Sequence, residues 1–348
     1  FFFWIHWVSA EGLRLLRTCP SPCFFFPVSV FLLLSGDGGA VCVQVYEGTL
    51  MDEEDAERTE APTVRALCDN NWEERVLVRR GKHSRFYHVH WAKGGVWLGL
   101  KEEECVDPLT TVRNVLPIQR LHSKFILHHY DICVDANRDT LLLVLTELMD
   151  YSLSDVMHRH CSRGHLTECQ ARAIAFLTLH ALVDLHDRIG MVHGDLSPSN
   201  ILLRATGELK LGDLSSAMPV NAAVDCFSGT VLYTAVEVLR DRQWASSPSS
   251  DVWALGVTLH ECVNGSHPFS GNSDENFWEF LSLMEAAMQA QQQPLCPPCF
   301  SRDFHDILSA MLCWDPARRP TVRSLLEHAW FSQYNVAAAQ RVLCLIAH

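Results

Sequence analysis

Asp195, Asn200 and Asp213 lie close together in the sequence, beside two apolar, strand-like segments, MVH (191–193) and LKL (209–211). A carboxylate can accept the proton of a hydroxyl group or hold that hydroxyl in place. Carboxylate and amide oxygens are also the hard ligands that suit magnesium bound to phosphates. Each of these residues alone would be interpreted as a turn residue or a loop charge. Together they indicate a proton acceptor beside a metal site.

The composition is that of a folded protein. The chain has 348 residues, of which 48% are hydrophobic and 20% charged, so a wholly disordered chain is excluded and about two domains are expected. Its net charge of −13 argues against nucleic acid and anionic membranes as partners. Fourteen cysteines are spread along the chain, which favours reduced core residues over a disulfide scaffold and predicts a cytoplasmic protein.

The first fifty residues are unlike the rest. Residues 24–34 form an apolar run that has the length of a secretory-signal core and is too short for a membrane span. Because the first methionine is Met51, we favour an upstream extension over a targeting segment for residues 1–50. Residues 51–72 are expected to be an acidic linker, and residues 334–348 a tail in which 337–346 have helical spacing.

The predicted secondary structure that positions these residues changes from strands to helices along the chain. Residues 76–80, 86–92 and 95–101 are predicted to form an antiparallel meander, followed by a helix at 111–121 and a buried strand at 141–147. After Asp150 the pattern is helical. A capping box at Thr167–Gln170 opens a helix that Gly190 ends, and Ser250–Asp251 opens a buried helix. A strand-rich part followed by a helix-rich part predicts an α+β protein with two lobes and a cleft.

Six motifs in a fixed order carry a family resemblance. They are MVHGDLSPSNILL (191–203), LKLGDLS (209–215), SGTVLYTAVE (228–237), DVWALG (251–256), HPF (267–269) and DPARRPT (315–321). With them the sequence resembles the eukaryotic protein kinases of the serine/threonine type, from about Arg75 to Phe331. The resemblance implies a kinase-like domain at 73–333, with an antiparallel-sheet N-lobe at 73–147 and a helical C-lobe at 151–333.

The resemblance also assigns site residues. It implies that Asp195, Lys101 and Asn200 are catalytic, and that Asn200 and Asp213 bind magnesium. The residues that it places around ATP are Gly81, Val89, Gly99, Lys101, Glu147, Met149, Leu202 and Asp213. Of these, Lys101 neutralises the inner phosphates, Val89 and Leu202 enclose adenine, and Gly99 leaves room for it. Glu147 and Met149 lie at the hinge, after the small residue Thr146.

Three further matches are structural. Glu237 is expected to pair with Arg319, and Asp251 is expected to hold the backbone of the catalytic loop through hydrogen bonds. The hydroxyl of Thr230 is expected to lie against Asp195, a pattern typical of kinases with serine or threonine acceptors.

Several positions depart from the family pattern. RRGKHSRFYHVH (79–90) supplies only Gly81 where a glycine-rich loop is expected, which predicts weaker phosphate binding. No glutamate occurs between Cys105 and Thr146 to pair with Lys101, and Asn114 takes its place in the alignment. Gly194 replaces the arginine that reads a phosphorylated activation loop, and Ser197 replaces a lysine that assists transfer.

The leading interpretation is a protein serine/threonine kinase that uses ATP and magnesium. Its partner is a protein substrate with a serine or threonine acceptor. The alternative is a pseudokinase that binds partners, with or without nucleotide, and transfers no phosphate. The departures from the family pattern favour the pseudokinase. The kinase is favoured by the four residues Lys101, Asp195, Asn200 and Asp213. Cys296 and Cys299, a lone CxxC pair, are assigned no metal.

Overall fold

The computed structural model describes part of the chain, which divides into two compact units. The described residues are 14–16, 28–33, 42–47, 72–81, 83–91, 95–135, 138–160, 165–222, 230–241, 246–269, 277–294, 296 and 298–345. The first unit contains Phe1–Leu121 and His128–Leu148, and the second contains His122–Leu127 and Met149–His348. Apart from Trp72, the expected acidic linker at 51–72 lies outside the described residues.

A small antiparallel sheet precedes the predicted domain. It consists of β1 (Arg14–Leu16), β2 (Val28–Leu33) and β3 (Cys42–Glu47), with β2 in the middle. Strand β2 falls inside the apolar run at 24–34. The structure therefore gives that part of the run as a strand, which neither interpretation of residues 1–50 anticipated.

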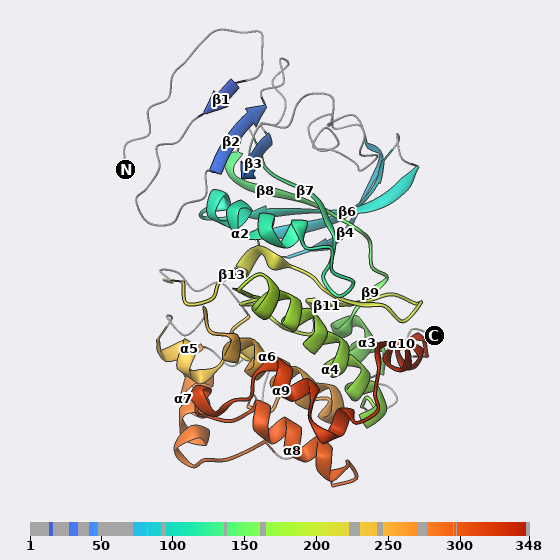
Figure 1. Cartoon of the computed structure of the whole chain (residues 1–348), viewed down its shortest axis with the longest axis vertical. Coiled ribbons are helices and arrows are strands. Elements are labelled where there is room, and N and C mark those ends of the chain that lie inside the picture. Colours follow the sequence, from blue (N-terminus) through green and yellow to red (C-terminus); the bar gives the residue numbers. More distant parts are fainter. Residues whose placement is uncertain are drawn as a thin grey trace. The chain divides into compact units, whose positions relative to one another are not determined.

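A five-stranded antiparallel sheet forms the main part of the first unit (Figure 1). In spatial order its strands are β4 (Trp72–Arg80), β5 (Ser84–Trp91), β6 (Val96–Glu104), β8 (Arg138–Thr146) and β7 (His129–Asp135). The predicted meander is confirmed in β4, β5 and β6, whereas β7 was not predicted. Lys101 lies within β6 rather than at its end, because the strand continues to Glu104.

The two faces of this sheet carry different residues. Residues directly opposite each other on neighbouring strands share a face. The Lys101 face contains Phe86, His88, Gly99, Lys101, Glu103, Val144 and Thr146, and the Leu100 face contains Arg85, Tyr87, Val89, Leu98, Leu100, Glu102 and Leu145. The register of β5 against β6 therefore decides which side chains accompany Lys101.

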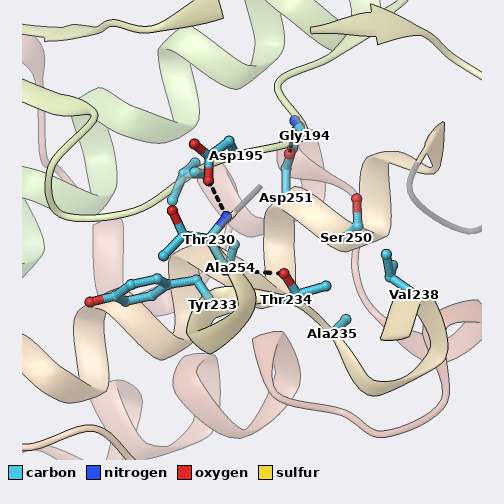
Figure 2. Close-up of a pocket in the computed structure, with 11 residues that line it drawn as sticks. Gly194, Asp195, Thr230, Tyr233, Thr234, Ala235, Val238, Ser250, Asp251 and Ala254 are labelled. Carbon is cyan, nitrogen blue, oxygen red and sulfur yellow. Dashed lines mark hydrogen bonds between the residues drawn. The ribbon is translucent and has the colours of Figure 1, made fainter. Parts of the chain in front are cut away.

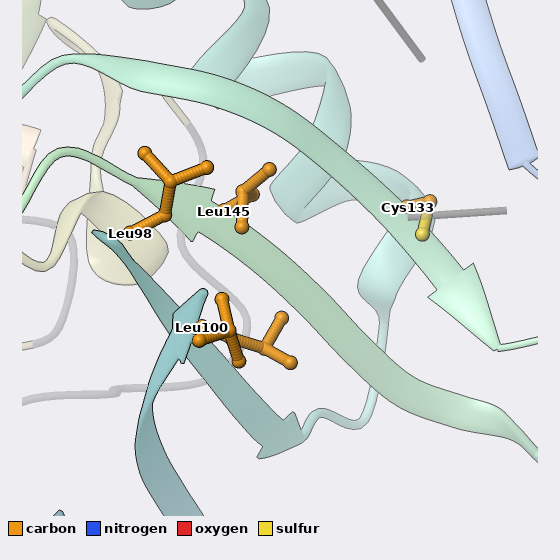
Figure 3. Packing of buried hydrophobic residues seen from close by; sticks show 5 residues of the cluster. Leu98, Leu100, Cys133 and Leu145 are labelled. Carbon is orange, nitrogen blue, oxygen red and sulfur yellow. The ribbon is translucent and has the colours of Figure 1, made fainter. Parts of the chain in front are cut away.

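The Leu100 face holds a hydrophobic cluster. Val89, Leu98, Leu100, Cys133 and Leu145 are each at most 3% exposed, and Tyr87 and Trp91 pack against them. Figure 3 shows four of these side chains on neighbouring strands of the sheet. The five residues of the cluster come from β5, β6, β7 and β8, so their burial ties these four strands together.

Helix α2 (Pro108–Arg120) begins three residues before the predicted helix. Asp107 caps its N-terminus, where the side chain accepts a 3.1 Å hydrogen bond from the N–H of Thr110, and Pro108 occupies the first turn. Val112, Val115 and Ile118 form its buried stripe. Pro117 lies inside the helix with its side chain exposed, and it donates no backbone hydrogen bond to the preceding turn.

Asp131 is a buried carboxyl on the Leu100 face. It lies opposite Leu145 and is 5% exposed. Its Oδ1 accepts a 2.8 Å hydrogen bond from the N–H of Ile132, and among the described residues its Oδ2 has no hydrogen-bond partner. Burial raises the pKa of Asp131 to about 6.

We expect Asp131→Asn to make the protein more stable at pH 8. Because the pKa of Asp131 is higher in the folded protein than in the unfolded chain, its contribution to stability is full below about pH 4 and is lost as the pH rises through about 6. Removing the ionisation should gain about 2 kcal/mol at pH 8, after the cost of burying an amide. Thermal unfolding from pH 4 to pH 8 measures this.

Asp135→Asn is the matched control, since it makes the same charge change on the same strand at a half-buried position. If the Asp131 variant and the parent lose stability equally between pH 4 and pH 8, the pKa of Asp131 is the same in the folded and the unfolded protein, and burial does not raise it.

The second unit is mostly helical (Figure 1). Its α-helices are α3 (Leu153–His160), α4 (Glu168–Val183), α5 (Val236–Arg240), α6 (Pro248–Asn264), α7 (Phe277–Gln289), α8 (Arg302–Met311), α9 (Val322–Leu326) and α10 (Val336–Cys344). Short strands accompany them: β9 (Tyr151–Ser152), β10 (Met191–Val192), β11 (Ile201–Leu203), β12 (Leu209–Leu211) and β13 (Met218–Pro219). Strands β12, β11 and β9 form one small sheet, and β10 pairs with β13.

The helix limits follow from local sequence. The capping box at Thr167 and Gln170 is confirmed at the start of α4. Beyond Val183 the chain continues as a π-helix to Arg188, and Gly190, with φ +66°, ends the helical path as predicted. Helix α6 begins at Pro248 after the cap Ser247, earlier than the predicted Ser250, and it is buried almost all round.

The predicted tail helix is confirmed as α10, which packs against α4. The Sγ of Cys344 donates a 2.9 Å hydrogen bond to the carbonyl oxygen of Thr206. Gly207, with φ +88°, lies so close to the carbonyl of Gln340 that a Cβ atom there would be 2.1 Å from that oxygen. The turn between β11 and β12 therefore needs glycine to accommodate the tail.

Candidate active site

The loop between β10 and β11, residues 193–200, is anchored by a buried carboxylate. Asp251 is 2% exposed and accepts hydrogen bonds from the backbone N–H groups of His193, at 2.8 Å, and Gly194, at 3.1 Å. Its Oδ2 also lies 2.7 Å from Nε2 of His186. Although burial alone raises the pKa of Asp251, hydrogen bonding from His186 and the loop holds it below its ordinary value. The predicted role of Asp251 is confirmed.

His193 connects this loop to the segment that carries Asp213. Its side chain is fully buried, and Nε2 lies 2.9 Å from the carbonyl oxygen of Gly212. Its Nδ1 accepts a 3.3 Å hydrogen bond from the N–H of Asp195, so the ring proton lies on Nε2. The sequence offered no signal for this role beyond the position of the histidine in the motif.

The carboxyl group of Asp195 is held at both oxygens. Oδ1 accepts a 2.6 Å hydrogen bond from the backbone N–H of Thr230, and Oδ2 accepts one of 3.2 Å from Nδ2 of Asn200. Thr230 thus contacts Asp195 through its amide, a contact that the expected hydroxyl interaction did not include. Burial raises the pKa of Asp195 and the charge of Asp213 adds to it, while hydrogen bonding from Thr230 acts in the opposite direction.

Asn200 and Asp213 supply oxygen atoms beside this carboxyl. The Nδ2 of Asn200 also donates a 2.7 Å hydrogen bond to the carbonyl oxygen of Asp195, which directs the amide nitrogen toward the loop. The N–H of Gly212 donates a 2.8 Å hydrogen bond to the carbonyl of Asn200 and so ties the two segments together. Asp213 has φ +53°, a left-handed conformation that is rare for residues with a side chain, and Ser215 Oγ donates a 2.8 Å hydrogen bond to its Oδ1.

These donors fit magnesium. The amide nitrogen of Asn200 is used by the loop, which leaves its oxygen to serve as a ligand, and Asp213 adds a carboxylate. One amide oxygen and one carboxylate suit a cation that takes its remaining ligands from phosphates and water. The structure therefore brings together, within the second unit, Asp195, Asn200 and Asp213.

A small cavity of about 20 Å³ lies beside Asp195, bounded by Gly194, Thr230 and Ala254 among others (Figure 2). This volume is enough for one water molecule. Gly194 has φ +77°, and a Cβ atom there would lie 2.6 Å from the carbonyl oxygen of Ser216. The backbone at this position therefore leaves no room for the arginine of the family pattern.

The predicted pair of Glu237 and Arg319 is confirmed. Both NH groups of the Arg319 guanidinium donate to the Glu237 carboxylate, one of them at 2.9 Å. Arg319 Nε also donates a 2.7 Å hydrogen bond to the carbonyl of Cys313, and the guanidinium lies over the ring of Trp253. Because the pair is largely buried and fully hydrogen-bonded, it fixes α5 against the segment before α9.

In the first unit Lys101 has a partner that sequence reasoning missed. Its Nζ lies 2.9 Å from Oε2 of Glu103, an ion pair whose angles fall outside those of a hydrogen bond. Both side chains are largely buried, at 18% and 22% exposure. Glu103 is two residues along the same strand and so shares the face of Lys101. This spacing was visible in the sequence, although the prediction sought the partner on the following helix and named Asn114.

The register of β5 against β6 bears on the expected adenine contacts. His88, not Val89, lies opposite Gly99 on the Lys101 face, while Val89 is fully buried in the cluster on the Leu100 face. This argues against Val89 as a residue that contacts adenine. The neighbours of Gly99 leave no room for a side chain, because a Cβ atom there would lie 2.8 Å from both the Phe86 ring and Thr146 Oγ1.

The other expected nucleotide contacts have local roles in the structure. Gly81 closes the turn after β4, where its N–H donates a 2.8 Å hydrogen bond to the carbonyl of Ser84. Glu147 accepts a 2.8 Å hydrogen bond from the N–H of His128. Leu202 is half-buried on β11, and Met149 is a half-buried residue at the start of the second unit.

Metal-binding clusters, disulfides and membrane-spanning helices are all absent among the described residues. Within the described part of the chain, no group of three histidine, cysteine or acidic side chains is arranged to hold a metal ion, and the cysteines described there are free. Cys133 and Cys262 are buried, as the composition predicted. None of the helices described is both long and apolar enough to cross a membrane.

Comparison with known proteins identifies the family. The protein kinase domain model matches residues 99–331, which is more than half of the chain, so the chain belongs to the protein kinase domain family. This confirms the resemblance and the α+β class, with an antiparallel sheet in the first unit and helices in the second. The match begins at Gly99, after the turn in which only Gly81 was found.

The curated relatives include several mitogen-activated protein kinase kinases. The chain is 32% identical over 200 residues to mitogen-activated protein kinase kinase 1c of Physcomitrium patens, covering 56% of each chain. It is 31% identical over 197 residues to mitogen-activated protein kinase kinase 2 of Arabidopsis thaliana, and 33% over 175 residues to mitogen-activated protein kinase kinase 5 of Leishmania mexicana. These matches cover 56% and 48% of this chain, and 53% and 32% of the relatives. The chain thus spans between 32% and 56% of the length of these relatives.

Proposed function

We propose that the protein is an ATP-dependent protein kinase that phosphorylates serine or threonine residues of another protein. The observation that carries this proposal is the carboxyl group of Asp195, which is fixed by Thr230 and Asn200 beside Asp213. Membership of the protein kinase family supports it. The relatives named above are kinases of proteins, which favours a protein over a small molecule as the substrate.

Asp195 would orient the substrate hydroxyl and accept its proton as the oxygen attacks the γ-phosphorus of ATP. A new oxygen–phosphorus bond forms, the bond to the β-phosphate oxygen breaks, and ADP leaves. Asn200 and Asp213 would hold magnesium, which neutralises charge on the phosphate oxygens when bound. Lys101 would bind the inner phosphates through its ammonium group.

Incubation of the wild-type protein with radiolabelled ATP, magnesium and a mixture of unphosphorylated proteins tests the proposal. We expect label on serine or threonine that depends on Asp195. A thermal shift with ATP and magnesium, together with no label on any protein, would instead establish a nucleotide-binding pseudokinase. In a parallel incubation with small metabolites in place of the proteins, label on a metabolite alone would assign a different class of kinase.

We infer a positioning role for Glu103, which depends on this function. The carboxylate of Glu103 holds the ammonium of Lys101 at 2.9 Å on the Lys101 face. In the family pattern, the glutamate that restrains this lysine lies on a helix instead. We expect Glu103→Gln to lower kcat/KM for ATP roughly tenfold, mainly through KM, because one charge-assisted contact is lost.

Glu74→Gln makes the same change at an exposed position on β4 and should leave the kinetics unchanged. Partial recovery in Glu103→Asp separates the carboxylate from simple packing. An unchanged KM for ATP in Glu103→Gln would show that Lys101 needs no partner on its own strand.

We also propose that the protein acts in the cytoplasm. The free cysteines of the described residues fit a reducing compartment, and the composition is that of a globular protein. Its partners would then be ATP, magnesium and a protein substrate in the same compartment.

A further inference from the structure

A second polar cavity lies in the first unit, at the end of the sheet where β4 turns into β5. Its volume is about 240 Å³. It is lined by Arg80, Gly81, His83, Ser84, Arg85, Glu102, Glu104, Arg138 and Leu141. Such a volume is several times that of one water molecule, so the cavity has room for a small polar group and for some of the atoms to which that group is attached.

The register places this cavity on the Leu100 face. Arg80 lies opposite Arg85, Arg85 opposite Glu102, and Glu104 opposite Leu141. Lys101 alternates with Glu102 along β6 and so points to the other side of the sheet. The charged wall of the cavity therefore lies on the other side of the sheet from Lys101 and Gly99, although Gly81, which the resemblance places near ATP, also lines the cavity.

The carboxylates of the cavity are already neutralised and hold arginines in place. Glu102 is 2.5 Å from the guanidinium of Arg75 and 3.8 Å from that of Arg85, and it accepts a 3.3 Å hydrogen bond from the hydroxyl of Tyr87. The Arg75 guanidinium in turn lies 3.8 Å from the centre of the Tyr87 ring. This network orders the wall beneath the cavity, while Arg85 remains only loosely engaged.

The basic groups exceed the acidic ones. Arg138 is 3.1 Å from Glu104, and among the residues that the structure describes no carboxylate pairs with Arg80. The turn itself, RRGKHSR at 79–85, has no acidic residue in a chain whose net charge is −13. A positive site on an otherwise acidic protein attracts anions selectively, because the surrounding surface repels them.

From this geometry we propose that the cavity binds a phosphate group, either as a monoester or as free phosphate. Arg80, Arg85 and Arg138 present planar guanidinium groups, which match phosphate oxygens in pairs. Leu141 provides one apolar side for the carbon atoms of the ester. The same chemistry occurs in a phosphorylated serine side chain and in free phosphate, so the test distinguishes these two sources.

Calorimetric titration of the full chain at pH 7.5 with acetylated phosphoserine amide, and separately with inorganic phosphate, tests the site. We expect saturable binding to one site, weakened about tenfold in Arg80→Gln because one charge-assisted contact is lost. Arg80→Gln should fold normally, since Arg80 is exposed and holds no carboxylate in the described part of the chain. Arg302→Gln, which removes the same charge on α8 where the side chain is 92% exposed, should bind as the parent does.

Tighter binding of the phosphoserine amide than of phosphate supports a phosphorylated protein segment as the ligand, and equal binding supports free phosphate. The proposal is overturned if neither probe saturates, or if Arg80→Gln binds both as the parent does. It is equally overturned if Lys101→Met abolishes binding of both probes, because the anion would then occupy the nucleotide surface. None of these outcomes depends on whether the protein transfers phosphate.

Discussion

The Asp195→Asn protein should bind ATP and magnesium as the parent does and transfer phosphate roughly a thousandfold more slowly. Asparagine is close in shape and keeps an oxygen that can accept the N–H of Thr230, now 2.6 Å from Oδ1. It cannot accept the proton of the substrate hydroxyl. The loss should therefore appear in kcat, while the thermal shift with ATP and magnesium is retained.

Asp306→Asn is the matched control for this variant. It makes the same chemical change on α8, where the side chain is 57% exposed and pairs only with Arg302 in the described part of the chain. Its transfer rate should equal that of the parent. If Asp195→Asn retained more than a tenth of the parent rate, Asp195 would not be the proton acceptor.

The pH profile provides a second signature of the same carboxyl. Transfer requires Asp195 in its charged form, and burial together with the nearby charge of Asp213 raises its pKa. The acid-side fall of kcat/KM should therefore occur at a higher pH than for an exposed carboxyl. The residual rate of Asp195→Asn should lack this limb.

The sequence predicted the contacts of the second unit well because they depend on residue type within motifs. Asp251 was expected to hold the loop backbone, and it accepts from both His193 and Gly194. Glu237 and Arg319 were expected to pair, and they do. In each case the motif buries a charged residue, and a buried charge without a partner is costly. The residue that pairs with it could therefore be predicted from the motif.

The sequence predicted the first unit less well because a sheet face depends on register. The family resemblance placed Val89 against adenine, but the pairing of β5 with β6 puts His88 opposite Gly99. A shift of one residue moves every side chain to the other face, and nothing in the sequence fixed that shift. The partner of Lys101 was missed for a different reason, since Glu103 satisfies the charge from the same strand.

The backbone conformation of Gly194 could not be predicted from the residue type alone. In the sequence it was only an absent arginine, with a consequence for regulation. In the structure it is a residue with φ +77° whose Cα faces the carbonyl oxygen of Ser216, and its N–H donates to Asp251. Any side chain at this position has to move the segment that follows Asp213 or abandon the bond to Asp251.

Gly194→Ala should consequently lower the free energy of unfolding by about 3 kcal/mol and remove most of the transfer activity. The left-handed backbone alone costs an alanine about 1 kcal/mol. The rest comes from the Cβ atom, which would lie 2.6 Å from the Ser216 carbonyl, and from the displaced bond to Asp251. Chemical denaturation and the transfer assay measure the two effects.

Gly190→Ala separates the two causes, because Gly190 has a similar φ of +66° but no atom within 4 Å of the added Cβ. It should lose only about 1 kcal/mol and keep its activity. If Gly194→Ala were no less stable than Gly190→Ala, the close approach to Ser216 would carry no energetic weight. In that case Asp195 would be positioned by its hydrogen bonds to Thr230 and Asn200 alone.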